Sequence, residues 1–346
     1  MLSIRNRAQP GKPVTDPALW TGEEMRGRTD WIRRFTDGEI DGLEALMAAT
    51  RGRIGIDPNG LLPLSPEDLD LRGFGAVLPA IRRELQDGRG FVLLRGLPVQ
   101  RWAPLDSAIV YWAIGRHLGQ PVSNNADCDM IAHVTDLGKS WDHPKHRGYQ
   151  TRADMDFHID YADAVLLLCL RTPASGGRSK IVSSVAVHND LAQRHPELAA
   201  ELEFPFYWTR HGEINPGEHD WYRAPVFNYV EGTLSVSCGP KHIEKGHLQP
   251  GVPPLTEKQT LALKAMHEAC ERLHLWMDFE PGDVQILNNS VIMHSRTEYQ
   301  DWPEPERKRL LWRLWLRVPE LRPMSPFVKQ WVNGIRVQGA TPRIVL

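Results

Sequence analysis

The stretch DMDFHIDYADAVLLLCL, residues 154–170, decides the fold and the chemistry that we expect from this chain. His158 and Asp160 alternate with apolar residues, so on a β-strand both polar side chains lie on one face and their neighbours on the other. The apolar run at 164–170 that follows is typical of a buried strand. The sequence therefore predicts a histidine and a carboxylate presented together at the start of a sheet.

A histidine and a carboxylate two residues apart, joined by a distant histidine, form the facial triad that binds iron in many non-haem sites. The short pattern is common, and context must choose among the copies. We set aside two copies because they fall in a predicted helix, where residues two apart point in different directions. The other two fall in polar or charged turns, so we expect solvated side chains there. The four rivals are His188/Asp190, His195/Glu197, His211/Glu213 and His242/Glu244.

The third ligand has to come from a remote stretch, and PGDVQILNNSVIMHSR at 281–296 offers it. We expect a turn at Pro281–Asp283, a strand at 284–289 and a second turn at the two asparagines. His294 then ends a short apolar element, where its imidazole would be held rigidly. For an isolated histidine the simpler interpretation is a core residue that is hydrogen-bonded to the backbone. The next segment favours the interpretation as a metal ligand.

The segment ERKRLLWRLWLRV at 306–318 predicts a strand with two different faces. One face carries Arg309, Leu311, Arg313, Trp315 and Arg317, and the other carries Leu310, Trp312, Leu314 and Leu316. Arginine binds carboxylates in a bidentate manner. Arg309 and Arg313 on one face could therefore hold two anionic groups in a single pocket.

The composition excludes several classes of protein. The 346 residues include 41 Lys+Arg and 43 Asp+Glu, which gives a formal net charge of −2. This balance argues against a nucleic-acid partner and against a basic membrane-surface protein. No apolar stretch is long enough to span a membrane, and no signal peptide is evident. The four scattered cysteines favour a reducing, cytoplasmic location.

The order of predicted elements indicates one mainly β domain with α-helical insertions. We expect an N-terminal arm at 1–30, a single domain at 31–320 and a C-terminal extension at 321–346. Short apolar runs between turn signals favour a β-sandwich or barrel with helices packed outside. The expected strands are 88–98, 164–170, 180–187, 234–238, 284–289 and 310–316. The expected helices are 30–50, 76–87 with Gly88 as C-cap, 105–119, 186–203 and 256–274 with Thr256 as N-cap.

The ordered combination of HID, SGG, PGD with NN and a distal His, and the RLLWR strand resembles the TauD/TfdA family of Fe(II)/2-oxoglutarate-dependent dioxygenases. This family is related to the clavaminate synthase-like enzymes. The resemblance covers roughly residues 88–318, including the GFVLLRGLP strand at 90–98. It implies a double-stranded β-helix, which is a jelly-roll barrel, buttressed by helices.

The resemblance also implies roles for individual residues. Arg309 would bind the C5 carboxylate of 2-oxoglutarate, and Arg313 would meet an anionic substrate group or the same region of the cosubstrate. Ser179, in SGGRSK, would hydrogen-bond 2-oxoglutarate at a position where family members often have threonine. The residues implied to bind iron are His158, Asp160 and His294.

The implied activity is the oxidation, most simply the hydroxylation, of an unactivated C–H bond with O2 while 2-oxoglutarate is converted to succinate and CO2. The carboxylate at Asp160 argues against a halogenase. We expect a small substrate that is anionic or amino-acid-like. Two alternatives stay open: a cupin-like metal-binding protein without oxygenase activity, and desaturation or cyclisation by the same enzyme class. A homo-oligomer is also left open. The candidate pocket residues are Asn124, Asn125, Thr151, Asp156 and the segment 204–222.

Overall fold

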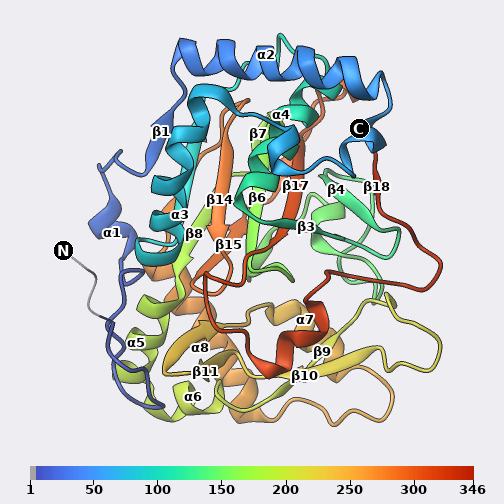
Figure 1. Ribbon diagram of the computed structural model, residues 1–346. Coiled ribbons are helices and arrows are strands. Elements are labelled where there is room, and N and C mark those ends of the chain that lie inside the picture. The colour runs from blue at the N-terminus through green and yellow to red at the C-terminus, as the bar shows by residue number, and fades with distance from the viewer. Residues whose placement is uncertain (1–4) are drawn as a thin grey trace.

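The computed structural model describes residues 5–346, and its strands form two main sheets (Figure 1). The larger sheet has the strand order β1-β2-β14-β6-β17-β4-β18, and β3 also pairs with β17. Its strands are β1 (Ile32–Arg34), β2 (Phe91–Arg95), β3 (Gln120–Val122), β4 (Asp129–Val134), β6 (Ala164–Arg171), β14 (Val284–Asn288), β17 (Leu310–Arg317) and β18 (Arg343–Ile344). The smaller sheet has the order β13-β8-β15-β5, with β13 (Leu275–Trp276), β8 (Ser179–Ser183), β15 (Ile292–Arg296) and β5 (Met155–His158).

Three two-stranded ribbons complete the β structure. Strand β7 (Ser175–Gly176) pairs with β16 (Tyr299–Gln300) beside the smaller sheet. The other two ribbons lie at the end of the molecule opposite α2 (Asp37–Ile54) (Figure 1). They pair β9 (Phe206–Thr209) with β10 (Trp221–Ala224), and β11 (Phe227–Val230) with β12 (Thr233–Val236).

The two faces of β17 pack into two different cores, as the sequence predicts. Leu311 and Trp315 belong to a cluster that also contains Ile181 of β8, so this face looks toward the smaller sheet. Leu314 and Leu316 belong to a second cluster, with the helices on the opposite face of the larger sheet. The alternation along one strand thus sets which side of the sheet is available for a site.

Helices cover the outer face and one end of the sheets (Figure 1). Helix α2, α3 (Leu78–Asp87) and α4 (Pro104–Leu118) contribute to the second core. At the other end lie α5 (Ser184–Arg194), α6 (Pro196–Glu201), α7 (Pro240–His247) and α8 (Glu257–Leu273). The predicted N-cap at Thr256 of α8 and C-cap at Gly88 of α3 are confirmed.

Four local expectations were wrong, each because of an end signal. The helix expected from residue 30 begins at Asp37 with Thr36 as its N-cap, and residues 32–34 form β1 instead. The strand expected through residue 187 ends at Ser183, whose hydroxyl accepts a hydrogen bond from the Ala186 N–H and caps α5. The single helix expected at 186–203 is two helices, because Pro196 begins a new one. The charged turn expected after Gly239 is the helix α7, with proline at its first position.

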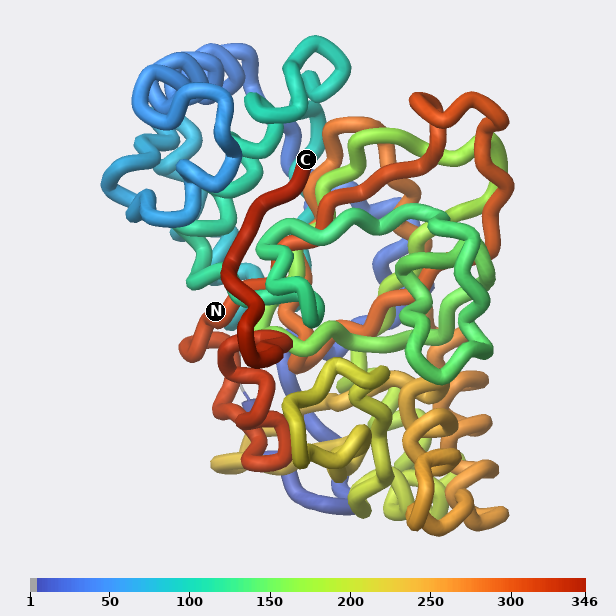
Figure 2. Tube along the Cα trace, turned by 90° about the vertical axis from the view of Figure 1, so that its right-hand side faces the viewer, coloured from blue at the N-terminus to red at the C-terminus, as the bar shows by residue number. Residues whose placement is uncertain are grey.

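Both ends of the chain pack on the body of the protein. In the arm, which includes α1 (Gly22–Met25), Val14 and Trp20 are buried in the first core. The amide side chain of Asn189 bonds both backbone groups of Val14, at 2.8 Å each. At the other end, β18 pairs in parallel with β4, and Figure 2 shows the last residues running alongside that segment. The arm and the extension are therefore anchored to the sheets.

The PGD turn before β14 is anchored by a buried ion pair. Arg95, at the end of β2, donates from Nε and Nη2 to the two carboxylate oxygens of Asp283, at 2.9 and 2.7 Å. Asp283 is fully buried. Gly282 has φ +92°, and a Cβ there would lie 1.9 Å from the carbonyl oxygen of Leu97. The turn therefore needs glycine, and the pair ties β14 to β2.

None of the helices in residues 5–346 is both long and apolar enough to cross a membrane. The four cysteines, Cys128, Cys169, Cys238 and Cys270, are buried and free, which agrees with the expectation of unpaired thiols. They form no disulfide with one another.

Candidate active site

The two predicted histidine ligands meet across neighbouring strands of the smaller sheet. Strands β5 and β15 are antiparallel, and their register places His294 directly opposite His158. The two imidazole centroids are 4.3 Å apart. Residues separated by 136 positions in the chain are thus brought together by one strand pairing. The motifs identified the two segments, and the strand register brings the two histidine side chains into contact.

Asp160 follows directly after β5 and is buried with a specific partner. One of its carboxylate oxygens, Oδ1, accepts a hydrogen bond from Arg313 Nη1 at 2.9 Å. The other, Oδ2, lies 3.7 Å from His294 Nε2, which is too long for a hydrogen bond. Arg313 is itself oriented by Asn124, whose side-chain oxygen accepts from its Nε at 3.1 Å. Asp160 is therefore held against the histidine pair by a buried guanidinium.

The protonation of these groups suits a cation. Burial lowers the pKa of His294 to about 3 and also lowers the pKa of His158, so both imidazoles are neutral near pH 7. Burial opposes the charged form of Asp160, but Arg313 and the histidines hold its pKa below the ordinary value. Neutral imidazoles and an ionised carboxylate are the forms that bind metal ions.

One carboxylate oxygen of this group is free to bind a metal ion. Asp160 Oδ2 is buried and has no hydrogen-bond partner within the described chain. A buried acceptor without a donor is costly unless a cation satisfies it. The donors do not form a closed cage, because no cluster of three His, Cys, Asp or Glu side chains in residues 5–346 is set to hold a metal as it stands. The donor types fit iron, and the side chains would have to close around it.

The proposed cosubstrate residues lie next to the histidines. A small cavity is lined by both imidazoles and by Ser179, Arg309 and Arg313. Arg309 is 4 % exposed and forms no ion pair among the described residues. Burial lowers the pKa of its guanidinium. Five of the six predicted site residues thus line one cavity, and Asp160 joins them through Arg313.

The SGG motif packs directly against Arg309. Gly177 has φ +66°, and a Cβ there would lie 3.3 Å from Tyr299 Cβ and 3.5 Å from Arg309 Nε. The ribbon of β7 and β16 brings the motif beside Tyr299. The nearest atom to that Cβ would be Pro173 Cγ at 2.8 Å, so the positive φ and the contact with Pro173 require glycine at this position.

A second cavity opens on the other side of His158 and Asp160. It is lined by Trp141, Arg147, Gly148, Tyr149, Met155, Asp156, His158, Ile159, Asp160, Tyr161, Gly239, Pro240, Lys241, His242 and Arg313. A third, larger cavity of about 760 Å³ shares Trp141, Asp156 and Lys241 with it. The two cavities are therefore neighbours, and the second one reaches His158 and Asp160.

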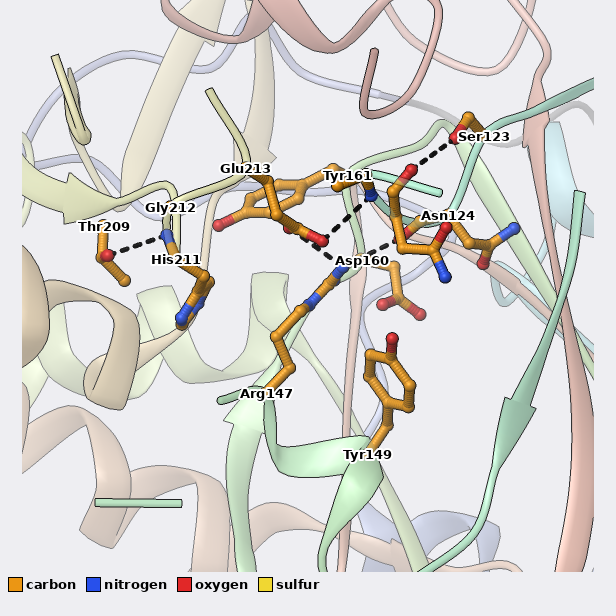
Figure 3. Close-up of polar contacts among 12 residues, drawn as sticks. Ser123, Asn124, Arg147, Tyr149, Asp160, Tyr161, Thr209, His211, Gly212 and Glu213 are labelled. Atoms are coloured by element: carbon orange, nitrogen blue, oxygen red, sulfur yellow. Dashed lines mark hydrogen bonds and ion pairs between the residues drawn. The ribbon is translucent and has the colours of Figure 1, made fainter. Parts of the chain in front are cut away.

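The second cavity is walled by a buried ion pair that the sequence did not indicate. Figure 3 shows the Arg147 side chain between Glu213 and Asn124, with Asp160 and Tyr149 close by. Its Nη1 donates to the Asn124 carbonyl oxygen at 2.8 Å and lies 3.5 Å from a Glu213 carboxylate oxygen. Arg147 thus ties the loop before β5 to the segment between β9 and β10.

The other candidate pocket residues have mixed outcomes. Asp156 lines the second and third cavities, and Thr151 lines the third. Asn124 acts through Arg313 instead of lining a cavity, and Asn125 bonds Asp129 on the outer side. Of the segment 204–222, Glu213 reaches the site through Arg147.

The four rival pairs do not assemble a comparable site, but the histidines of three of them are wholly or partly buried instead of solvated. His188 is buried and bonds the Tyr229 hydroxyl at 2.8 Å. His211 is buried beside His242, which bonds the Tyr161 hydroxyl at 3.0 Å. His242 lines the second cavity and was missed because its helix was not recognised.

The comparison with known families decides the assignment. The family model described as "Taurine catabolism dioxygenase TauD, TfdA family" matches residues 58–315. The chain belongs to this family. The predicted resemblance is confirmed, and this TauD/TfdA dioxygenase contains all six predicted site residues within the matched range.

Curated relatives cover most of this TauD/TfdA dioxygenase. FR-33289 synthase of Streptomyces rubellomurinus is 31% identical over 333 residues, which are 92% of this chain and 95% of the relative. Taurine hydroxylase-like protein SAT17 of Stachybotrys chartarum is 27% identical over 316 residues, which are 87% of this chain and 79% of that protein. The similarity therefore extends well beyond the motifs.

Solved structures share the fold of this TauD/TfdA dioxygenase. Asparagine oxygenase in complex with Fe(II), 2S,3S-3-hydroxyasparagine and succinate has a TM-score of 0.66 at 18% identity, over 88% of this chain and 98% of that one. The non-heme iron oxygenase OrfP in complex with Fe and alpha-ketoglutaric acid has a TM-score of 0.60 at 16% identity, over 83% and 94%. The sheet-rich architecture with helices is thus that of the iron oxygenases.

Proposed function

We propose that this chain is a non-haem Fe(II)- and 2-oxoglutarate-dependent dioxygenase that hydroxylates an unactivated C–H bond of a small, amino-acid-like substrate with an anionic group. The observation that carries the proposal is the meeting of His158, His294 and Asp160 beside a cavity that holds the unpaired Arg309. The complexes of asparagine oxygenase with hydroxyasparagine and of OrfP with (3S)-hydroxy-L-Arg support the substrate class.

The iron ligands in this proposal are His158, Asp160 and His294. Fe(II) with 2-oxoglutarate and O2 supplies the oxidising chemistry, in which the cosubstrate becomes succinate and CO2. His158 donates from Nδ1 to the Asp156 carbonyl oxygen at 2.9 Å, which leaves the Nε2 lone pair for the metal. Arg313 keeps Asp160 ionised and directed at the histidines. The three donors come from one side, so the remaining coordination positions are left for cosubstrate and O2.

Arg309 and Ser179 are assigned to the C5 carboxylate of 2-oxoglutarate. Arg309 is a buried cation without an acidic partner in the described chain, which is the state expected of a residue that pairs with a ligand. Arg313 already serves Asp160 through Nη1, yet its Nη2 has no partner. That nitrogen is available to an anionic group of the substrate or to the cosubstrate.

The substrate is assigned to the second cavity, between the loop before β5 and α7. The lining carries three cationic side chains, Arg147, Lys241 and Arg313, and two carboxyl groups, those of Asp156 and Asp160. The Asp160 carboxylate is already paired with Arg313. Burial raises the pKa of Asp156. This lining favours an anionic, amino-acid-like molecule.

The finer architecture is proposed as a double-stranded β-helix. Side chains of β17 and β6 from the larger sheet share one core with side chains of β8 and β15 from the smaller one, which supports two sheets closed over a common interior. We retain the division into an arm at 1–30, a catalytic domain at 31–320 and an extension at 321–346. The four free cysteines support a cytoplasmic location. A homo-oligomer stays a prediction.

Anaerobic reconstitution tests the proposal against its alternatives. The apo protein is loaded with Fe(II), bound iron is measured, and 2-oxoglutarate is then added. We expect a visible charge-transfer band that appears only after 2-oxoglutarate is added. A protein that binds iron but gives no band would be a cupin-like metal protein. Product analysis after O2 is admitted separates hydroxylation from desaturation or cyclisation.

Replacing Arg309 with alanine should weaken 2-oxoglutarate binding strongly. A buried carboxylate that loses its charged partner costs about 2–5 kcal/mol, which corresponds to a dissociation constant raised about 30-fold or more. The measurement is the anaerobic titration of the charge-transfer band. If Arg313→Ala has this effect and Arg309→Ala does not, the two roles are reversed.

A further inference from the structure

The cavity that is lined by Ser179 and Arg309 contains a third buried arginine, Arg296, besides Arg309 and Arg313. It lies on β15 two residues after His294, so both side chains project from the same face of the strand. Its register partner on β8 is Ser179. Arg296 lines the same small cavity as Ser179 and Arg309.

The charge of Arg296 is not neutralised. Its side chain is buried, and it forms no ion pair within residues 5–346. Nη1 donates to the carbonyl oxygens of Arg152 and Thr297 at 3.1 and 3.3 Å, and Nη2 donates to that of Thr151 at 3.0 Å. Its Nε is buried and has no partner. Carbonyl dipoles orient the guanidinium but leave its positive charge in place.

Arg296 and Arg309 also share one aromatic neighbour. The guanidinium carbons lie 4.6 and 5.1 Å from the ring centroid of Tyr299. The two guanidinium groups therefore flank the same ring. Burial lowers the pKa of Arg296, and the positive charge of Arg309 lowers it further. Two neighbouring cations that are both buried and both unpaired repel each other, and burial makes each more costly. Such an arrangement is stable when an anion binds between or beside them.

We propose that Arg296 is a second cation of the subsite for the distal carboxylate of 2-oxoglutarate, and that with Arg309 it selects a dicarboxylate over a 2-oxo acid with an uncharged tail. This inference rests on the proposed function, because it assumes that Ser179 and Arg309 face that carboxylate. Arg296 thereby acts on cosubstrate selection, and its bonds to the carbonyls of 151 and 152 hold it in position.

A comparison of two ligands separates this role from a structural one. The probes are 2-oxoglutarate and 2-oxopentanoate, which has a methyl group where 2-oxoglutarate has the distal carboxylate. Binding to the Fe(II)-loaded protein is measured by anaerobic calorimetry, without turnover. We expect Arg296→Gln to weaken 2-oxoglutarate binding at least tenfold and to change 2-oxopentanoate binding less than about twofold. Equal weakening of both ligands, or no weakening of 2-oxoglutarate, would overturn the inference.

Two further variants complete the design. Arg296→Lys keeps the charge but loses the forked hydrogen bonds, so it should retain most of the preference for 2-oxoglutarate. If it behaves like Arg296→Gln, the residue acts through its backbone contacts and the inference fails. Arg309→Gln tests the underlying assignment. If the wild-type protein binds no 2-oxoglutarate, or if Arg309→Gln does not weaken its binding, the proposed function fails. If Arg309→Gln weakens binding and Arg296→Gln does not, only the role of Arg296 is overturned.

Discussion

Replacing Asp160 or His158 with alanine abolishes the conversion of 2-oxoglutarate to succinate, if the proposed ligand set is right. Each side chain supplies one of three donors to the metal, and two donors hold iron too weakly and leave its geometry undefined. Succinate formation is measured by chromatography after incubation with Fe(II), ascorbate, 2-oxoglutarate and O2. Thermal unfolding shows that each variant is folded, and bound iron is measured directly.

A rival pair provides the matched control. His195 and Glu197 have the same spacing as His158 and Asp160, and both are exposed, His195 just before α6 and Glu197 in its first turn. His195→Ala should therefore leave succinate formation and iron content unchanged. Full activity in His158→Ala or Asp160→Ala would remove the basis for the iron site.

Replacing Arg95 with alanine should lower the free energy of unfolding by about 3–5 kcal/mol. The substitution leaves the Asp283 carboxylate fully buried without its bidentate partner. Burial already raises the pKa of Asp283 while Arg95 is present. When folding raises the pKa of a carboxyl group, the folded protein loses stability as the pH rises through that raised pKa. The cost in Arg95→Ala should therefore be smaller at acidic pH, where Asp283 is protonated.

The control for this prediction is another arginine of similar chemistry. Arg178 pairs with Asp278 at 2.8 Å, but both side chains are about half exposed. Arg178→Ala should change stability by less than about 1 kcal/mol, because solvent screens the pair. Urea unfolding of the apo protein measures both variants. Equal losses in the free energy of unfolding of the two variants would show that burial does not increase the contribution of the Arg95–Asp283 pair.

Much of the fold was predictable because it depends on local alternation. The two faces of β17 follow from its apolar and arginine positions, and α8 follows from Thr256 and its apolar periodicity. The ribbons β9–β10 and β11–β12 were not predicted as pairs. Their strands are four residues long, and long-range contacts decide how they pair.

The site was predictable as a set of residues but not as a geometry. No local signal fixes which residue of β15 faces His158, since the register depends on the packing of the whole smaller sheet. Arg147 and Glu213 are 66 residues apart, and no local pattern links them, so their pairing could not be foreseen. Arg296 could have been found, because its position two residues after His294 places it on the same strand face.

The most direct test of the account is a crystal structure of the protein with Fe(II) and 2-oxoglutarate, prepared without O2 and analysed with anomalous scattering at the iron edge. We predict one iron ion bound by His158, Asp160 and His294 as its protein ligands, with the distal carboxylate of 2-oxoglutarate on Arg309. An iron ion bound elsewhere, a fourth protein donor that closes the coordination sphere, or a His294 side chain directed away from the other two ligands would contradict the account.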